Sequence, residues 1–339
     1  MADGEIFGAT AEGEPVRRIS IAGGGLSAKI LNWGAVVQDL RLVGHDAPLV
    51  LGFDRFGDYP TLSPYFGAIV GRHANRIRDG RFTLAGHRHQ IDPAFPEQHG
   101  LHGGSDGFFK KVWRVVDQGA DFATLALDDP DGSMGFPGAI QVRCTYRLKI
   151  PGALSVELTA TCDEPTLCNL AQHSYFNLDD GGSGDILDHR LVINASAYLP
   201  VDQSTVPNGV VEPVGGTRFD FRLARPIRME SGGAQIAYDH NFCLAAARSA
   251  LKQAAWVQGA SSGVEMEVWT TEPGLQFYTG QFLRPDTEGL DGRRYNAFSG
   301  FCLEPQTWPD SPNRAYFPQA VLWPGEIYRQ TTEYRFRQA

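Results

Sequence analysis

Two consecutive stretches in which apolar and polar residues alternate limit most strongly how this chain can fold. Apolar side chains occupy every second position from residue 140 to 148, and again from residue 154 to 162 after a Pro151-Gly152 turn. Because successive side chains of a strand point to opposite faces of a sheet, this period of two predicts an antiparallel hairpin with one buried and one wetter face. Residues 264–268 repeat the pattern further along the chain.

Turn-forming residues divide the rest of the chain. The sequence contains 39 glycines and 21 prolines spread along its length, so the segments between turns are mostly too short for long helices. Residues 245–256 have a helical composition but lie between two strand-like segments, which leaves helix and strand equally open there. There is no internal repeat and no linker-like change in composition. The prediction is an all-β chain in which residues 1–339 form one large antiparallel domain with few short helices.

The charge balance argues against polyanionic partners. There are 30 Lys and Arg against 39 Asp and Glu, a net charge of −9, which does not suit a nucleic-acid backbone or an anionic membrane. No apolar stretch approaches the roughly 18 residues of a membrane span, and the acidic first residues are unlike a secretory signal. The five cysteines are an odd number without a CxxC pair, as is typical of reduced thiols. We therefore expect a cytoplasmic protein.

Five segments carry more polar and aromatic side chains than turns need. Each mixes an ionisable residue with apolar or aromatic neighbours, which is typical of a small-molecule site assembled from several loops or strand ends. The segments are GRHANRI (71–77), HGLHGG (99–104), HSYFNL (173–178), AYDHNF (237–242) and LEPQTWPDSPN (303–313).

Taken one at a time, most of the polar residues in these segments have an ordinary interpretation. Arg76 could be a surface ion-pair partner, and Asn75 and His102 could be turn residues. Asp239 could be a side-chain cap. Glu304 is harder to explain in this way, because it ends an apolar run and a carboxylate buried without a role is costly.

Other chemistries have little support in the sequence. The histidine pairs at positions 87 and 89 and at positions 99 and 102 have no Asp, Glu or third His at a metal-motif spacing, so no metal site is predicted. A Ser-His-Asp hydrolase is weakly supported. No G-x-G-x-x-G or Walker loop is present, so nothing indicates a nucleotide.

Eight short motifs occur in an order that makes the chain resemble the aldose 1-epimerases, the galactose mutarotases. One such motif would be a weak signal, whereas eight in order, from about Phe7 to near the C-terminus, are a strong one. The resemblance implies a large twisted antiparallel β-sandwich with a sugar cleft across it. The motifs are GRHANRI, LHGG with the following Gly107-Phe108 and Trp113, DGSMGFPG, HSYFNL, VPNGVVEPVGGTRFDF, YDHNF, TEPGLQFYTG and LEPQTWPDSPN.

The resemblance also implies roles for individual residues. The histidine of the HSYFNL motif is the general acid in such enzymes and the glutamate of the LEPQ motif is the general base, which here are His173 and Glu304. The implied sugar-binding residues are Asn75, Arg76, His102, Tyr175, Asp239 and Gln276. Three departures from the family pattern touch none of these positions, and they are Gly100, Met134 and Val264.

Anomerisation of a cyclic aldose fits these residue types. The ring oxygen must gain a proton as the C1–O5 bond breaks, and the C1 hydroxyl must lose one. Glutamate is a ready base near neutral pH, and carboxylates around a histidine can keep it protonated. Tyr175, Phe277 and Trp308 could cover the apolar face of a pyranose, although packing is as good an interpretation for Trp308. No electron or group leaves the substrate, so no cofactor is expected.

Three alternatives remain open from the sequence. A lectin-like sandwich could bind sugar without turnover, and a glycosidase could use Glu304 with Asp239 as its carboxylate pair. A relative that acts on a phosphorylated or unusual sugar would gather arginines, and strand alternation would send Arg72, Arg76 and Arg78 to one face. The sequence determines neither the preferred sugar nor whether the protein is a monomer or a homodimer.

Overall fold

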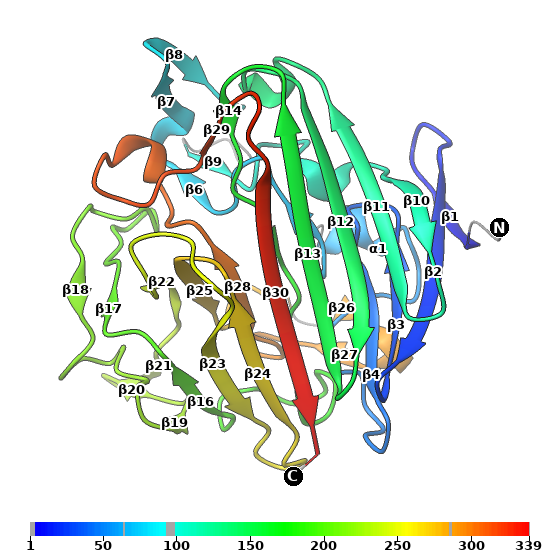
Figure 1. Cartoon of the computed structure of the whole chain (residues 1–339). Helices are drawn as coiled ribbons and strands as arrows, with labels where there is room; N and C mark the ends of the chain where they lie inside the picture. Colours follow the sequence, from blue (N-terminus) through cyan, green and yellow to red (C-terminus); the bar gives the residue numbers. More distant parts are fainter. Residues whose placement is uncertain (1–3, 64, 93–98, 285–286, 339) are drawn as a thin grey trace.

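A nine-stranded antiparallel sheet forms the largest layer of the molecule (Figure 1). The structure is a computed structural model that describes residues 4–63, 65–92, 99–284 and 287–338. In spatial order the strands of this sheet are β10 (Arg114–Gln118), β11 (Phe122–Asp129), β12 (Ile140–Lys149), β13 (Ala153–Cys162), β30 (Tyr328–Arg337), β24 (Glu265–Thr270), β23 (Lys252–Gln258), β16 (Arg190–Ile193) and β19 (Arg225–Pro226).

The hairpin predicted from the alternating pattern lies inside this sheet, between β11 and β30. Strands β12 and β13 pair in continuous register from Ile140 opposite Cys162 to Lys149 opposite Ala153. Along β12 every second side chain is buried and the residues between are exposed or half-buried. The pattern at residues 264–268 is confirmed in the same way, because its apolar residues are buried and its two glutamates are half-buried.

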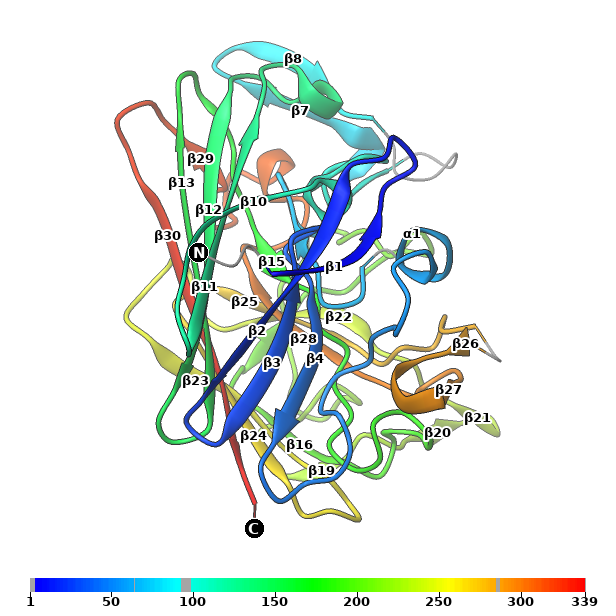
Figure 2. The ribbon, with the colours of Figure 1, turned by 90° about the vertical axis from the view of Figure 1, so that its right-hand side faces the viewer.

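Two smaller antiparallel sheets pack with the large one to complete the predicted all-β architecture. Figure 2 shows the large sheet at the left, and α1, β26 and β27 on the opposite side of the molecule. The four-stranded sheet contains β1 (Glu5–Ala9), β2 (Pro15–Gly23), β3 (Leu26–Leu31) and β4 (Val37–Leu42). The five-stranded sheet, in spatial order, contains β18 (Glu212–Pro213), β17 (Ala197–Tyr198), β22 (Asp239–Cys243), β25 (Gly274–Tyr278) and β28 (Cys302–Gln306).

Short elements fill the connections. The described residues form six two-stranded pairs, which are β14 (Thr166–Leu167) with β29 (Val321–Leu322), β15 (Ala171–Gln172) with β5 (Ile69–Val70), β20 (Glu230–Ser231) with β21 (Ala234–Gln235), β26 (Thr287–Glu288) with β27 (Arg294–Tyr295), β6 (Arg76–Ile77) with β9 (Gly100–Leu101), and β7 (Arg81–Leu84) with β8 (His87–Gln90). The α-helix among the described residues is α1 (Asp58–Leu62), and single 3₁₀ turns cover Arg78–Gly80, Phe108–Lys110, Ser133–Gly135, Leu290–Gly292 and Ser311–Asn313.

The ambiguous stretch 245–256 contains no helix. Residues 245–251 form bends and coil, and strand β23 begins at Lys252. Pairing with β16 and β24 on either side overrides the helical composition, since each neighbour supplies ladder hydrogen bonds. In the part of the chain that the structure describes, none of the helices is both long and apolar enough to pass through a membrane.

Side chains of strand β30 in the large sheet donate hydrogen bonds to the backbone of strand β28 in the five-stranded sheet. The Tyr334 hydroxyl donates to the Leu303 carbonyl at 3.1 Å, and the Gln330 amide donates to the Pro305 carbonyl at 3.0 Å. Both side chains are buried and lie four positions apart, hence on the same face of β30. The large sheet therefore holds the backbone on both sides of Glu304.

Arg72 joins two of the sequence motifs inside the fold. Its guanidinium is 1% exposed and makes an ion pair of 2.7 Å with Asp129. It also donates to the Thr166 hydroxyl and to the main-chain carbonyls of residues 129, 130, 137 and 138, so the DGSMGFPG turn wraps around it. Arg78 pairs instead with Asp202 at 2.7 Å. The prediction that Arg72, Arg76 and Arg78 share one face is therefore wrong, because β6 covers only two residues and alternation does not extend across this segment.

Candidate active site

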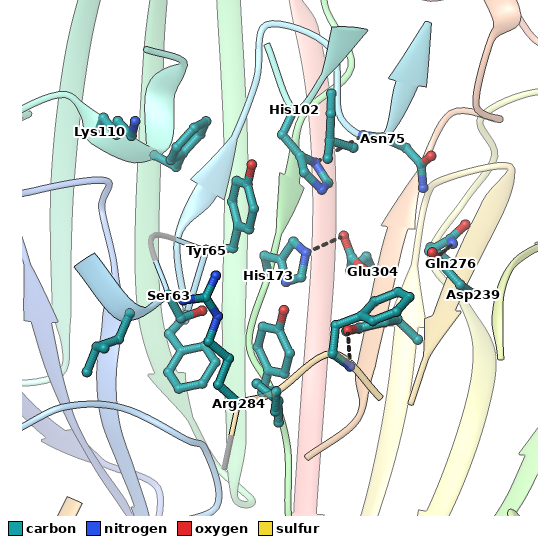
Figure 3. A pocket seen from close by; sticks show the side chains of 18 of the residues that line it. Ser63, Tyr65, Asn75, His102, Lys110, His173, Asp239, Gln276, Arg284 and Glu304 are labelled. Carbon is teal, nitrogen blue, oxygen red and sulfur yellow. Dashed lines mark hydrogen bonds and ion pairs between the residues drawn. The ribbon is translucent and has the colours of Figure 1, made fainter. Parts of the chain in front are cut away.

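A pocket of about 410 Å³ opens on the side of the molecule away from the large sheet (Figure 3). Its size lies within the range of small-molecule sites, about 300–1,000 Å³. Leu62 at the end of α1, Phe282 and Arg284 are exposed and form its rim. His173 and Glu304 are buried and form its floor.

His173 and Glu304 face each other across the floor of the pocket. The backbone N–H of His173 donates to the Ala68 carbonyl at 2.9 Å, and its carbonyl accepts the Gly67 N–H at 3.0 Å. Glu304 lies in the middle of β28, opposite Gln276 of β25. His173 Nε2 and Glu304 Oε2 are 3.6 Å apart, the contact drawn as a dashed line in Figure 3. A possible proton donor and a possible proton acceptor thus share one buried space.

A second group of residues is held together by hydrogen bonds between segments that are far apart in the chain. Asn75 has a φ of 61°, in the left-handed region that asparagine tolerates. Its N–H donates to His102 Nδ1 at 3.1 Å, while the His102 N–H donates to the Asn75 carbonyl at 3.1 Å. The N–H of Asp310 donates to the Arg76 carbonyl at 2.8 Å. The GRHANRI, LHGG and LEPQTWPDSPN motifs are therefore three walls of one pocket.

Asp239 and Gln276 form a further side of the pocket, on neighbouring strands β22 and β25. The Gln276 amide donates to Asp239 Oδ1 at 2.6 Å, and an Arg76 nitrogen lies 3.6 Å from Asp239 Oδ2. Because both carboxylate oxygens already have partners, Asp239 is better suited to orienting its neighbours than to acting with Glu304 as a glycosidase pair. Glu304 Oε2 and Gln276 Oε1 are buried and accept no hydrogen bond from the described residues.

The structure brings all of the predicted site residues to this pocket. Its lining includes His173, Glu304, Asn75, Arg76, His102, Tyr175, Asp239 and Gln276. Phe277 and Trp308 do not line it, so the predicted sugar contact of Phe277 is wrong, whereas for Trp308 the packing interpretation is confirmed. Phe277 points into the main core, as alternation along β25 requires, and Trp308 packs on Leu199 and donates to the Pro273 carbonyl at 2.9 Å.

Sequence reasoning missed several other lining residues, among them Tyr65, Lys110, Tyr278 and Arg284. Tyr65 follows a proline in an ordinary turn-like sequence, Lys110 is followed by a second lysine, and Arg284 is a single cation in its segment. Tyr278 lies in the TEPGLQFYTG motif, but nothing in its local sequence or in that of the other three separates them from packing or solvated residues. Only contacts between segments far apart in the chain place them in the pocket.

Burial sets the charge preferences of the ionisable groups in the pocket. It lowers the pKa of His173 to about 4. It also raises the pKa of Glu304 well above its usual range; the charge of Asp239 raises that pKa further, and the charge of Arg76 lowers it. Burial is the largest cause that lowers the pKa of His102, and the neighbouring His173 lowers it further. The expectation that carboxylates keep His173 protonated is thus opposed by desolvation. Stabilisation of the imidazolium must come from groups in direct contact with its ring.

Three residues of the pocket are of types that can bind a metal ion. His102, His173 and Glu304 each offer one ligand atom, and these atoms lie within 4.8 Å of one another. However, His102 Nδ1 accepts the Asn75 N–H, so the neutral ring carries its proton on Nε2. Metal binding at that nitrogen would require the other tautomer and the loss of the Asn75 hydrogen bond. The arrangement suits donation to a hydroxyl better than ligation of a metal.

Comparison with known proteins gives a family for this fold and pocket. Residues 17–335 match the family described as Aldose 1-epimerase. The chain belongs to the aldose 1-epimerase family. The resemblance drawn from the eight motifs is therefore confirmed, and the protein is an isomerase.

The similarity extends over almost the full length of other members of the family. The chain is 42% identical over 330 residues to the galactose mutarotase of Rattus norvegicus, covering 96% of this chain and 95% of the relative. It is 36% identical over 336 residues to the aldose 1-epimerase of Escherichia coli K12, covering 96% of each. The crystal structure of the GalM/aldose epimerase homologue from C. elegans superposes with a TM-score of 0.88 at 29% identity, covering 96% of this chain and 99% of that one.

Proposed function

We propose that this aldose 1-epimerase interconverts the α and β anomers of free aldohexoses such as glucose and galactose. His173 acts as the general acid and Glu304 as the general base. Asn75, Arg76, His102, Tyr175, Asp239 and Gln276 hold the sugar hydroxyls and cover the ring. The proposal requires no metal or other cofactor, since no electron or group leaves the substrate.

The reaction needs two proton transfers, one at each of the two oxygens bonded to C1. Nε2 of His173 gives a proton to the ring oxygen as the C1–O5 bond breaks, and Glu304 takes the proton of the C1 hydroxyl as the carbonyl forms. The open aldehyde rotates about its C1–C2 bond. Ring closure on the other face then returns both protons, with Glu304 as the acid and His173 as the base, so the enzyme ends as it began.

The observation that carries this proposal is the buried contact of 3.6 Å between His173 Nε2 and Glu304 Oε2. The two oxygens that exchange protons are attached to the same carbon, so the acid and the base must be close together. A binding module would not need such a pair. The carboxylate oxygen of Glu304 that lacks a hydrogen bond supports the same proposal, because a sugar hydroxyl can satisfy it.

Polarimetry on freshly dissolved α-D-galactose and α-D-glucose tests the activity directly. We expect the optical rotation to reach equilibrium much faster with the protein than without it. An unchanged relaxation rate for both sugars would contradict the proposed function. Release of reducing sugar from an aryl glycoside, measured in parallel, would instead indicate a glycosidase.

The pH dependence of kcat/KM follows from the buried pair. The pair must carry one proton, so activity is expected to fall as the pH decreases through about 4, where His173 and Glu304 would both be protonated. On the alkaline side it should fall only above the usual range of a glutamate, because burial raises the pKa of Glu304. Initial rates from acid to alkaline pH, corrected for spontaneous mutarotation, check this. A rate that still increases below pH 4 in protein shown to remain folded would contradict it.

The sequence also supports proposals about the protein as a whole. We infer that residues 1–339 form one domain, since one hydrophobic core includes Ile19 of β2 and Phe336 of β30. The free cysteines suit a cytoplasmic location. The protein is proposed to be a monomer or a homodimer, which light scattering would distinguish.

A further inference from the structure

Two tyrosine rings stack with the imidazole of His173. The Tyr65 ring lies 5.7 Å from it with an angle of 18° between the planes, and the Tyr175 ring lies 5.2 Å away at 21°. Tyr175 lies two positions after His173, in the segment that follows β15. Tyr65 comes from the segment before β5, whose backbone is tied to His173 through Gly67. Figure 3 shows Tyr65 beside His173, on the pocket wall.

Tyr65 is itself held by aromatic neighbours. Its ring lies 4.8 Å from the ring of Phe109 and 4.9 Å from the ring of His102. Burial raises the pKa of its hydroxyl to about 12, so the ring stays neutral under all working conditions. A neutral ring with this support is a rigid surface, and neither the sequence motifs nor the family pattern assigned it a role.

The other groups in contact with the imidazole are a carboxylate, a thiol and a second imidazole. From β28, Glu304 lies 3.6 Å from Nε2 and the Cys302 sulfur lies 3.6 Å from Nδ1. From the loop after β9, the neutral His102 meets it edge-on at 5.1 Å. The charges of Arg76 and Asp239 act mainly on Glu304. Among the described residues, the groups that can offset the desolvation of a protonated His173 are Glu304, the two tyrosine faces and the backbone of His173 itself, whose hydrogen bond to the ring raises its pKa.

We propose that Tyr65 is a positioning residue that, together with Tyr175, holds the His173 imidazole face-on and favours its protonated form. The negative face of an aromatic ring attracts a cation placed over it. The same stack restricts rotation of the imidazole, which keeps Nε2 directed at Glu304. This inference rests on the proposed role of His173 as the proton donor.

The test compares Tyr65→Leu, which removes the ring, with Tyr65→Phe, which keeps it. For Tyr65→Leu we expect kcat to fall roughly three- to thirty-fold, the range of a cation–π contact, with KM changed less than about two-fold. The NMR titration midpoint of His173, assigned with His173→Asn, should move to lower pH by roughly 0.5–1.5. Tyr65→Phe should restore both values.

Controls separate this inference from a general loss of structure and from failure of the proposed function. Tyr316→Leu makes the same change at an exposed surface tyrosine and should leave kcat unchanged. If Tyr65→Leu does not fold, Tyr65→Met keeps more of the side-chain volume without a ring. A wild-type titration midpoint in Tyr65→Leu, or Tyr65→Phe as impaired as Tyr65→Leu, would overturn the role of the ring while leaving the mutarotase proposal intact. Full activity in His173→Asn would overturn the proposed function itself.

Discussion

Glu304→Gln and His173→Asn should each lower kcat for mutarotation by about 10²–10⁴-fold, the usual contribution of a positioned general acid or base. Glutamine keeps the shape of Glu304 but cannot accept the C1 hydroxyl proton, and asparagine cannot protonate the ring oxygen. The double variant should be little worse than either single variant, because each removes the same concerted step. Polarimetry with freshly dissolved α-D-galactose measures all three.

The matched control for this prediction is Glu230→Gln, which makes the same change on an exposed turn strand. It should retain wild-type kcat. Sugar binding, measured by calorimetry, should persist in Glu304→Gln, because the hydroxyl-binding residues remain. If Glu304→Gln retains more than about a tenth of the wild-type kcat, Glu304 is not the base.

Arg72→Met should lower the free energy of unfolding by about 3–5 kcal/mol, since it leaves the buried carboxylate of Asp129 without its partner. Asp129 is 5% exposed and its ion pair with Arg72 measures 2.7 Å. The main-chain carbonyls of Pro130, Pro137 and Gly138, the last two in the DGSMGFPG turn, also lose their donor. Urea or guanidinium unfolding followed by tryptophan fluorescence measures the change.

Arg78→Met provides the comparison for Arg72→Met. Arg78 and Asp202 form an ion pair of 2.7 Å, but both side chains are 35% exposed. Solvent screens such a pair, so we expect a loss of less than about 1 kcal/mol. Adding Asp129→Leu to Arg72→Met should recover part of the stability by removing the unpaired charge. Equal denaturation midpoints for Arg72→Met and wild type would show that the buried pair contributes little.

Local patterns in the sequence were sufficient to predict an antiparallel hairpin in the large sheet. The alternation at residues 140–148 and 154–162 records which side chains face the core, and the predicted hairpin forms as β12 and β13. Residues 245–256 show where such reasoning ends. Their helical composition is a weak local preference, and pairing of β23 with two neighbouring strands outweighs it.

The motifs were sufficient to nominate the site but not to sort the residues within each motif. Arg72 and Arg76 look equivalent in GRHANRI, yet Arg72 is buried against Asp129 while Arg76 lines the pocket near Asp239. Trp308 is four residues from Glu304 in the LEPQTWPDSPN motif, yet its side chain packs in a separate apolar cluster. The carboxylate partners that distinguish Arg72 from Arg76, Asp129 and Asp239, are more than fifty residues away from them in the chain.

The sequence by itself determined the all-β class, the family and the identity of the paired acid and base candidates, because each depends on residue type and order along one segment. Only the tertiary structure decided that His173 Nε2 and Glu304 Oε2 lie 3.6 Å apart, and that burial works against the protonated histidine. It also decided that Tyr65 completes an aromatic stack on that ring. Desolvation and ring stacking are properties of neighbours in space, and the folding of β5, β15 and β28 against one another makes these residues neighbours.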